Sequence, residues 1–352
     1  MSNFSDLDTN FKVETKIKEE GICFHDVREE PFKIYGVFYD NGRFRRIPTE
    51  VAKTVNETVL ALHSHSAGGR VRFKTDSPYI AIHAKMGSIV KMEHIPLTGS
   101  GGFDMYMGHG PERYIKTFVP PYDMTDGYES IFRCGSSAMR EVTINLPTYS
   151  SVLELYIGLK EGAQILPPRP YAIEKPIVYY GSSITQGGCA SRPGNTYQSV
   201  ITRRLDADHI NLGFSGSARG ETTMAEYIAG LEMSAFVYDY DHNAPTLEHL
   251  QKTHEPMFKI IRQAHPDIPI VLMTRPEYKL SEEDPRLQTI KKTYENALAA
   301  GDKNVYFLDG TALMEMAGFD GTVDGVHAND LGFASMAKAV GDVLEKALKK
   351  TD

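Results

Sequence analysis

The sequence contains no tryptophan and only three cysteines, Cys23, Cys134 and Cys189. They are too few and too scattered for a disulfide framework, and none forms a C-x-x-C pair, so we expect three free thiols. Without tryptophan, any aromatic surface that stacks against a ligand has to use tyrosine or phenylalanine.

An excess of basic residues and long apolar runs are also missing. The formal net charge is -8 and no run rich in lysine and arginine occurs, so nucleic acid is not an expected partner. No segment approaches the roughly 18 apolar residues of a membrane-spanning helix. The first eight residues lack the basic start and apolar segment of a secretory signal. We therefore expect no membrane association and a cytoplasmic protein, or a secreted one if a leader has been removed.

What is present suffices for two ordinary domains. The 352 residues are 41% hydrophobic and 24% charged, as in globular proteins, and one domain typically uses about 100 to 200 residues. In the first half, short β-prone runs alternate with a period near two between Gly, Pro, Asn and Asp. These runs cover residues 34–39, 71–73, 79–84, 141–146 and 152–157. They predict an all-β, jelly-roll-like sandwich over residues 1–170.

The pattern changes after Pro167-Pro168-Arg169-Pro170. Apolar runs, as in strands buried on both faces, occupy 177–180, 209–214, 236–240, 268–274 and 305–308. Helical segments are expected at 196–205, 222–231, 247–264, 285–300 and 331–349, the last capped by Asn329 and Asp330. The alternation predicts an α/β fold for residues 171–352, a flavodoxin-like three-layer α/β/α domain with a five-stranded parallel sheet. Its ligands should bind at the carboxyl ends of the strands.

The loop after the first of these strands, residues 181–187, reads Gly-Ser-Ser-Ile-Thr-Gln-Gly. A sharp turn of this kind can expose a serine hydroxyl, as a nucleophile requires. A plain Gly/Ser turn or a phosphate cradle remains an alternative, although the chain has neither a P-loop lysine motif nor a G-x-G-x-x-G at this place.

Three later loops carry polar or glycine residues at the corresponding positions. Gly216 follows the second strand, where a backbone N–H could approach a substrate oxygen, and Asn243 follows the third, where its amide could donate to the same oxygen. Asp324 and His327 stand three residues apart before the last helix, a spacing that lets the carboxylate orient the imidazole. An ordinary turn explains any one of these loops as well as a catalytic role does. Four such loops in this order along the chain are not expected by chance.

Together the four segments resemble the four conserved blocks of the SGNH (GDSL-type) hydrolase superfamily, over residues 174–350. The resemblance implies a serine esterase without metal or cofactor. Its nucleophile is Ser183, its general base His327, and Asp324 orients the base. The implied oxyanion-hole donors are the Ser183 amide, Gly216 and Asn243. The sequence departs from the family in having Ser182 where Asp usually precedes the nucleophile, and His242 and Ala244 around Asn243.

Other polar residues near these loops are open to two interpretations. Arg192 and Arg275 could bind a substrate carboxylate or hydroxyl, or form structural ion pairs. His63 and His65 would share one face of a strand, as in some metal sites, but no third ligand is recognisable and ordinary strand histidines are the simpler interpretation. Cys189 follows the nucleophile loop and is expected to be a packed or partly exposed cysteine rather than a nucleophile, because nothing in the sequence suggests an adjacent base.

The order of a sandwich before the catalytic domain is similar to that of several bacterial carbohydrate acetyl esterases. It implies hydrolysis of short acyl esters, acetyl above all, on a small-molecule or oligosaccharide substrate through an acyl-Ser183 intermediate. The alternatives are a lipid, thioester or longer-chain acyl hydrolase, and a carbohydrate-binding protein whose catalytic turn is weakened by Ser182. The sequence does not predict an oligomeric state.

Overall fold

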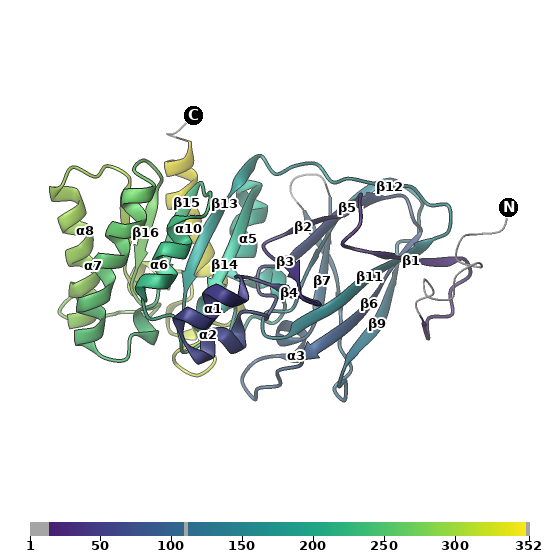
Figure 1. The fold of residues 1–352 in the computed structure, drawn as a ribbon, viewed down its shortest axis with the longest axis horizontal. Helices are drawn as coiled ribbons and strands as arrows, with labels where there is room; N and C mark the ends of the chain where they lie inside the picture. The colour runs from purple at the N-terminus through teal and green to yellow at the C-terminus, as the bar shows by residue number, and fades with distance from the viewer. Residues whose placement is uncertain (1–13, 109–111, 350–352) are drawn as a thin grey trace.

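The computed structural model describes residues 14–108 and 112–349, so the first 13 residues of the predicted sandwich domain and the last three of the chain lie outside the described part. The molecule is elongated, with an antiparallel sandwich at one end and a helix-covered parallel sheet at the other (Figure 1). The predicted fold class is confirmed.

Two antiparallel sheets form the sandwich. One has the order β1 (Ile22–Asp26), β11 (Ser151–Lys160), β6 (Tyr79–Ser88), β9 (Gly127–Arg133). The other has the order β12 (Ile165–Leu166), β5 (Arg70–Thr75), β10 (Arg140–Asn145), β7 (Phe103–Met107), β8 (Arg113–Phe118), and β2 (Lys33–Tyr35) also pairs with β5. From β5 to β12 the chain crosses between the sheets repeatedly, as in a jelly roll.

The two-residue period of the sequence explains the sandwich core. Along β6, Ile80, Ile82, Ala84 and Met86 recur at every second position and all lie in the buried cluster between the sheets. A separate hairpin of β3 (Phe38–Asp40) and β4 (Arg43–Arg45) leads from this sandwich toward the other domain.

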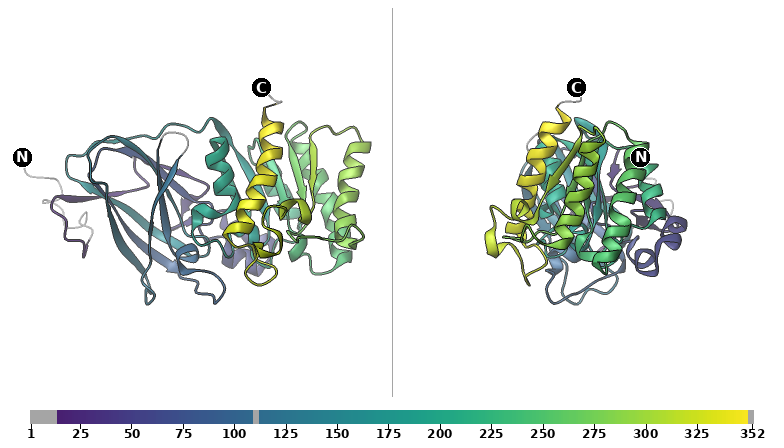
Figure 2. Two further views of the ribbon diagram at one scale, coloured as in Figure 1. Left: turned by 180° about the vertical axis from the view of Figure 1, so that it is seen from behind. Right: turned by 90° about the vertical axis from the view of Figure 1, so that its left-hand side faces the viewer.

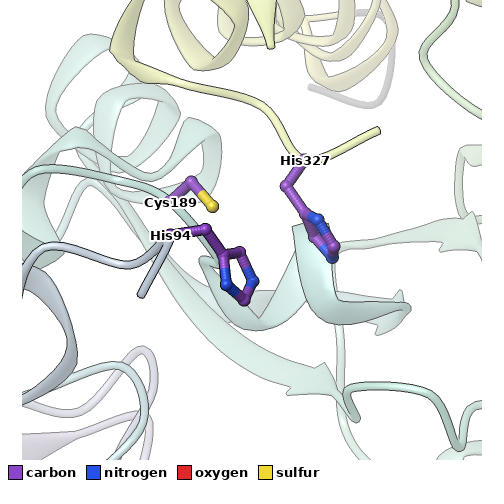
Figure 3. Close-up of side chains that lie close together, drawn as sticks. All are labelled: His94, Cys189 and His327. Carbon is purple, nitrogen blue, oxygen red and sulfur yellow. The ribbon is translucent and has the colours of Figure 1, made fainter. Parts of the chain in front are cut away.

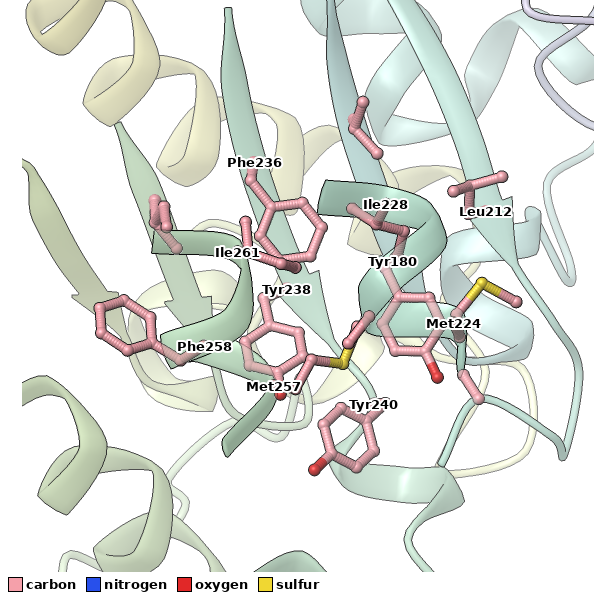
Figure 4. Close-up of a cluster of buried hydrophobic side chains, with 14 of the residues drawn as sticks. Tyr180, Leu212, Met224, Ile228, Phe236, Tyr238, Tyr240, Met257, Phe258 and Ile261 are labelled. Atoms are coloured by element: carbon pink, nitrogen blue, oxygen red, sulfur yellow. The ribbon is translucent and has the colours of Figure 1, made fainter. Parts of the chain in front are cut away.

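The second domain is a five-stranded parallel sheet in the order β14-β13-β15-β16-β17, the strand order of the flavodoxin-like fold. Its strands are β13 (Ile173–Gly181), β14 (Ala207–Gly213), β15 (Ala235–Asp239), β16 (Ile270–Met273) and β17 (Val305–Leu308). Residues of β15 alternate between two cores: Phe236 and Tyr238 face one (Figure 4), whereas Ala235 and Val237 face the other. Burial on both faces accounts for the continuous apolar runs.

Helices cover both faces of this sheet. On one face lie α6 (Thr222–Ala229), α7 (Leu247–Ala264) and α8 (Pro285–Ala299). On the other lie α5 (Tyr197–Leu205) and α10 (Asp330–Leu348), which are in front in the left view of Figure 2. These five helices were predicted, with ends within two residues. Asn329 caps α10 as expected, accepting from the N–H groups of Leu331 and Gly332, both at 3.0 Å. No helix in the described ranges is long and apolar enough to span a membrane.

The sequence did not predict two short helices, α1 (Thr49–Val55) and α2 (Glu57–Leu62). They lie in the range assigned to the sandwich, yet Ala52 and Val59 pack in the same core as Phe236. The N-cap of α2, Asn56, also donates to the Glu221 carboxylate at 2.8 Å. The first half of the chain therefore contributes a covering layer to the parallel sheet.

Candidate active site

Ser183 lies just beyond the carboxyl end of strand β13, as the first residue of the four-residue helix α4 (Ser183–Gln186). Gly181 makes the turn possible, since a Cβ there would collide with the carbonyl oxygen of Asp239. The Ser182 N–H donates to that carbonyl at 2.9 Å, and the Ser182 hydroxyl accepts from the Ile184 N–H at 3.2 Å. The side chain that replaces the family's aspartate thus caps the nucleophile helix.

The structure brings Ser183, His327 and Asp324 into one hydrogen-bonded chain. The distance from His327 Nε2 to Ser183 Oγ is 3.0 Å, and from His327 Nδ1 to Asp324 Oδ2 it is 2.8 Å. With Nδ1–H donating to the carboxylate, Nε2 is the nitrogen that can accept the serine proton. Ser183 is 9% exposed, so its hydroxyl is nearly buried but reachable.

Asp324 and His327 are held in a closed turn. Oδ1 of Asp324 accepts the backbone N–H groups of Val326 at 3.0 Å and His327 at 2.8 Å. A backbone bridge between Thr322 and Ala328 closes the turn. Burial alone would raise the pKa of Asp324, but the hydrogen bonds from His327 and Val326 outweigh it and hold that pKa well below its usual range. The carboxylate is therefore charged in the folded protein near neutral pH.

The predicted oxyanion donors come from the three loops that follow β13, β14 and β15. Gly216 has φ +69° and open space where a side chain would project, and neither its N–H nor that of Ser183 donates to an acceptor among the described residues. Asn243, in the short helix η4 (Asp241–Asn243), donates from Nδ2 to the Phe214 carbonyl at 3.0 Å. That bond ties the Asn243 loop to the Gly216 loop and leaves the second Nδ2 hydrogen for another acceptor.

Arg275 is occupied by protein carboxylates. It bonds Asp284 and Glu277, each at 2.8 Å, and lies 3.5 Å from Asp241. Asp241 in turn accepts from Arg286 at 2.7 Å. These bonds hold the loops after β15 and β16 together. Of the two interpretations of Arg275, substrate contact and structural ion pair, the structure shows ion pairs.

Arg192 lies at the junction of the two domains. Its guanidinium is 3.9 Å from the ring centroid of Tyr114, and its Nε is 3.5 Å from the buried carboxylate of Asp104 on β7. Asp104 also accepts the Gly194 N–H, at 2.8 Å, just after the nucleophile loop. Here too the side chain serves as a structural cation.

His63 and His65, which were considered as metal ligands, have different partners in the structure. His63 is the C-cap of α2, not a strand residue, and its Nε2 lies 2.6 Å from Arg45 Nη1. His65 contacts Gln186 through its Nδ1, at 3.2 Å. The placement of these two histidines on one strand was therefore wrong.

The sequence did not predict the neighbours of the His327 imidazole. The His94 and His327 ring centroids are 5.1 Å apart, and Cys189 lies beside both (Figure 3). Burial, reinforced by the charge of Asp324, raises the pKa of Cys189 to about 12, so this thiol is not a nucleophile at neutral pH. His94 comes from the connection between β6 and α3 (Leu97–Ser100) in the sandwich half, and no spacing rule relates it to His327.

The imidazole of His242 lies next to this group. The residue is half-buried, and its Nε2 is buried without a hydrogen-bond partner in the described structure. Burial, together with the nearby cation Arg275, lowers the pKa of His242 to about 4 despite the opposing charge of Asp241. His242 is therefore neutral at pH 7 and adds no positive charge beside the base.

Comparisons with known proteins agree with this geometry. Residues 174–345 match the model of the GDSL-like lipase/acylhydrolase family, and residues 22–165 match that of the N-terminus of SGNH hydrolase-type esterases. No curated protein matches the chain.

Solved structures resemble the chain over nearly its whole length. A protein described as a GDSL-like lipase from Bacteroides ovatus is 28% identical, with a TM-score of 0.82 over 93% of this chain and 98% of its own. A salicylyl-acyltransferase from a tetracycline biosynthetic pathway is 18% identical, with a TM-score of 0.73 over 95% of this chain and 98% of its own. An acetyl xylan esterase from the rumen bacterium Butyrivibrio proteoclasticus is 12% identical, with a TM-score of 0.61 over 94% and 100%. The last two share the fold.

The two matched ranges lie in the two domains. The range 174–345 includes Ser183 after β13, and Asp324 and His327 before α10. Residues 174–345 therefore belong to the GDSL-like lipase/acylhydrolase family, and the chain is an ester hydrolase of the SGNH type that carries the N-terminal domain of such esterases.

Proposed function

We propose that this enzyme hydrolyses short acyl esters of carbohydrates, acetyl esters above all, through a covalent acyl-Ser183 intermediate. The observation that carries the mechanism is the continuous relay from Ser183 Oγ to His327 Nε2 at 3.0 Å and from His327 Nδ1 to Asp324 at 2.8 Å. A serine hydroxyl is a weak nucleophile unless a base stands within hydrogen-bond reach, and this one does.

Acylation follows from the relay. Ser183 Oγ attacks the ester carbonyl carbon while His327 Nε2 takes the hydroxyl proton, and Asp324 stabilises the imidazolium that forms. The N–H groups of Ser183 and Gly216 and the amide of Asn243 donate to the oxyanion of the tetrahedral intermediate. The imidazolium then protonates the leaving sugar hydroxyl as the carbon–oxygen bond breaks. Water, deprotonated by His327, releases the acid and restores Ser183.

The replacement of aspartate by Ser182 does not interrupt this chemistry. The Ser182 hydroxyl accepts from the Ile184 N–H, which stabilises the start of α4, and in the described residues it forms no hydrogen bond with His327 or Asp324. The bond from the Ile184 N–H to the Ser182 hydroxyl supports an intact turn at Ser183, which argues against the alternative of a binding protein with a weakened catalytic turn.

The substrate class rests on the relatives of this fold. The acetyl xylan esterase from Butyrivibrio proteoclasticus and a family two carbohydrate esterase from Clostridium thermocellum, solved with cellohexaose, have the same two-domain architecture. The preference for short acyl groups, the oligosaccharide substrate and a cytoplasmic location are all parts of this proposal.

The test is hydrolysis of p-nitrophenyl acetate, butyrate and octanoate, with acetate release from peracetylated sugars measured in parallel. We expect acetate to be preferred and Ser183→Ala to lower kcat by several orders of magnitude, on the scale of ~10⁶ seen for a serine protease nucleophile. Ser182→Ala is the matched control, because it removes the adjacent hydroxyl outside the relay. A preference for octanoate would favour the lipid alternative, and full activity in Ser183→Ala would refute the mechanism.

A further inference from the structure

A cluster of soft metal ligands lies against the catalytic base. One ligand atom each of His94, Cys189 and His327 lie within 4.8 Å of one another (Figure 3). Two imidazoles and a thiol are the donor set that Zn²⁺ takes in proteins, and no carboxylate belongs to the cluster to favour Mg²⁺ or Ca²⁺.

Two of the three donors have no competing partner. In the parts of the chain that the structure describes, neither the imidazole of His94 nor the thiol of Cys189 forms a hydrogen bond or ion pair, and His94 is half-buried. In a folded protein most buried polar groups are paired, so two unpaired donors that face the same space leave it open to a ligand.

The backbone holds these donors in place without a metal. Ile95, which follows His94, packs against Cys189 and Tyr149 in a small buried cluster. On either side of Cys189, the Gly188 N–H donates to the Ser183 carbonyl at 2.8 Å and the Ala190 N–H to the Gly187 carbonyl at 3.2 Å. Cys189 itself has φ +77°, a conformation that non-glycine residues seldom adopt unless the surroundings impose it.

The spacing is close to that of a tetrahedral site. Zinc binds sulfur at about 2.3 Å and imidazole nitrogen at about 2.0 to 2.1 Å, which sets the donor atoms about 3.4 to 3.6 Å apart. The donor atoms, which lie within 4.8 Å of one another, therefore have to approach by about 1 Å for an ion to bind. With three protein ligands, a bound ion would take a water molecule in the fourth position, and the Cys189 thiol would release its proton to solvent on binding.

We propose that His94, Cys189 and His327 form a Zn²⁺ site and that the bound ion reversibly inhibits the esterase. Both ring nitrogens of His327 are used in the relay, Nδ1 by Asp324 and Nε2 by Ser183. Whichever nitrogen binds the ion, one relay bond is lost and the base can no longer accept the serine proton. The inhibition rests on the proposed function, whereas the metal binding does not.

The first experiment measures binding alone. Metal-free enzyme is titrated with Zn²⁺ in a calorimeter and with Co²⁺ in a spectrophotometer, where a coordinated thiolate gives a charge-transfer band. We expect one ion per chain and the band in the wild type and in Ser183→Ala. Cys189→Ser should lose the band, and His94→Ala should weaken Zn²⁺ affinity at least tenfold, since even outer-sphere changes at metal sites weaken binding 10- to 100-fold. Cys23→Ser, which removes an exposed thiol, is the matched control and should bind normally.

The second experiment measures ester hydrolysis at buffered free Zn²⁺, each variant being compared with its own metal-free rate. Wild type and Cys23→Ser should be inhibited, chelation should restore activity and Mg²⁺ should have no effect. His94→Ala and Cys189→Ser should need at least tenfold more Zn²⁺ for half inhibition.

The outcomes separate this inference from the proposed function. An unchanged Co²⁺ band in Cys189→Ser, or absence of the band in the wild type, overturns the site. Binding without inhibition overturns the regulatory role. If Ser183→Ala hydrolyses esters normally yet binds Zn²⁺ through these ligands, the serine mechanism fails and the metal site stands.

Discussion

The guanidinium of Arg46, just before α1, donates from Nη1 to the carbonyl oxygen of Gly213 at the carboxyl end of β14. Its Nη2 donates to the Leu62 carbonyl at 2.8 Å, and its Cζ lies 4.5 Å from the ring centroid of Phe214. The side chain is 2% exposed, and burial lowers its pKa to about 9. A single arginine thus links the helices of the first half to the strand that leads into the Gly216 loop.

Replacing this arginine should loosen the junction. Arg46→Met keeps much of the volume but leaves buried carbonyls without donors, so we expect the free energy of unfolding to fall by about 2 to 4 kcal/mol. Urea denaturation measures the change. The control is Lys53→Met on α1, where an exposed ion pair with Glu50 is lost and less than about 1 kcal/mol is expected. Equal effects of the two changes would contradict the role of Arg46.

The orienting carboxylate gives a second prediction. Asp324→Asn should lower kcat on the order of 10⁴-fold, as the equivalent change does in a serine protease triad, because the amide favours the wrong tautomer of His327. KM should change little, since Asp324 is not expected to touch the substrate. Steady-state kinetics measures both constants, with Asp320→Asn in the adjacent exposed segment as the control.

A third prediction concerns the two glycines of the site. Gly181→Ala places a methyl group against the Asp239 carbonyl and should destabilise the fold and abolish activity together. Gly216→Ala meets open space and suffers mainly from its φ of +69°, so a loss of about 1 kcal/mol and a partial loss of kcat are expected. Thermal melting and kinetics of both variants check the contrast, which would be refuted if Gly216→Ala were the more destabilised.

The fourth prediction concerns pH. Asp239, beneath the nucleophile turn, is fully buried, and one carboxylate oxygen lacks a partner in the described structure. The other accepts from Thr185 at 3.1 Å. Burial raises the pKa of Asp239 to about 7. Between about pH 4 and pH 7 the unfolded chain releases this proton while the folded chain keeps it, so this group makes stability fall as pH rises through that window.

Asp239→Asn removes the ionisable group and keeps its shape. The variant should gain stability over the wild type as pH rises from 4 to 8, by at most about 4 kcal/mol, since each pKa unit corresponds to 1.36 kcal/mol. Melting temperatures at pH 4, 6 and 8 test the sign, with Asp320→Asn as the exposed control. A gain that is larger at pH 4 than at pH 8 would show that the carboxylate is not the cause.

The sequence was informative wherever function and fold depend on local spacing. Asp324 and His327 meet because they stand three residues apart in one turn, and Ser183 is placed by the strand before it. The comparisons with known proteins confirmed the family resemblance and the enzyme class. Helices α1 and α2 escaped prediction because segments of seven and six residues are not stable alone and depend on tertiary packing.

Long-range contacts account for the rest. His94 approaches His327 only because the sandwich packs beside the catalytic loops. Asp330, predicted to cap α10, instead accepts the Ser191 N–H at 2.8 Å and the Asn195 amide at 2.9 Å. Arg192 and Arg275 were left open between substrate and ion pair because the paired carboxylates, such as Asp104, come from distant elements.

The closed turn of residues 322–328 carries the base and its carboxylate on one piece of backbone, whereas the nucleophile belongs to another. The alignment of base and carboxylate is thus an internal property of seven consecutive residues. A designer could move this heptapeptide as a cassette into another parallel-sheet protein, and the Ser-to-His distance would be the one dimension left to adjust.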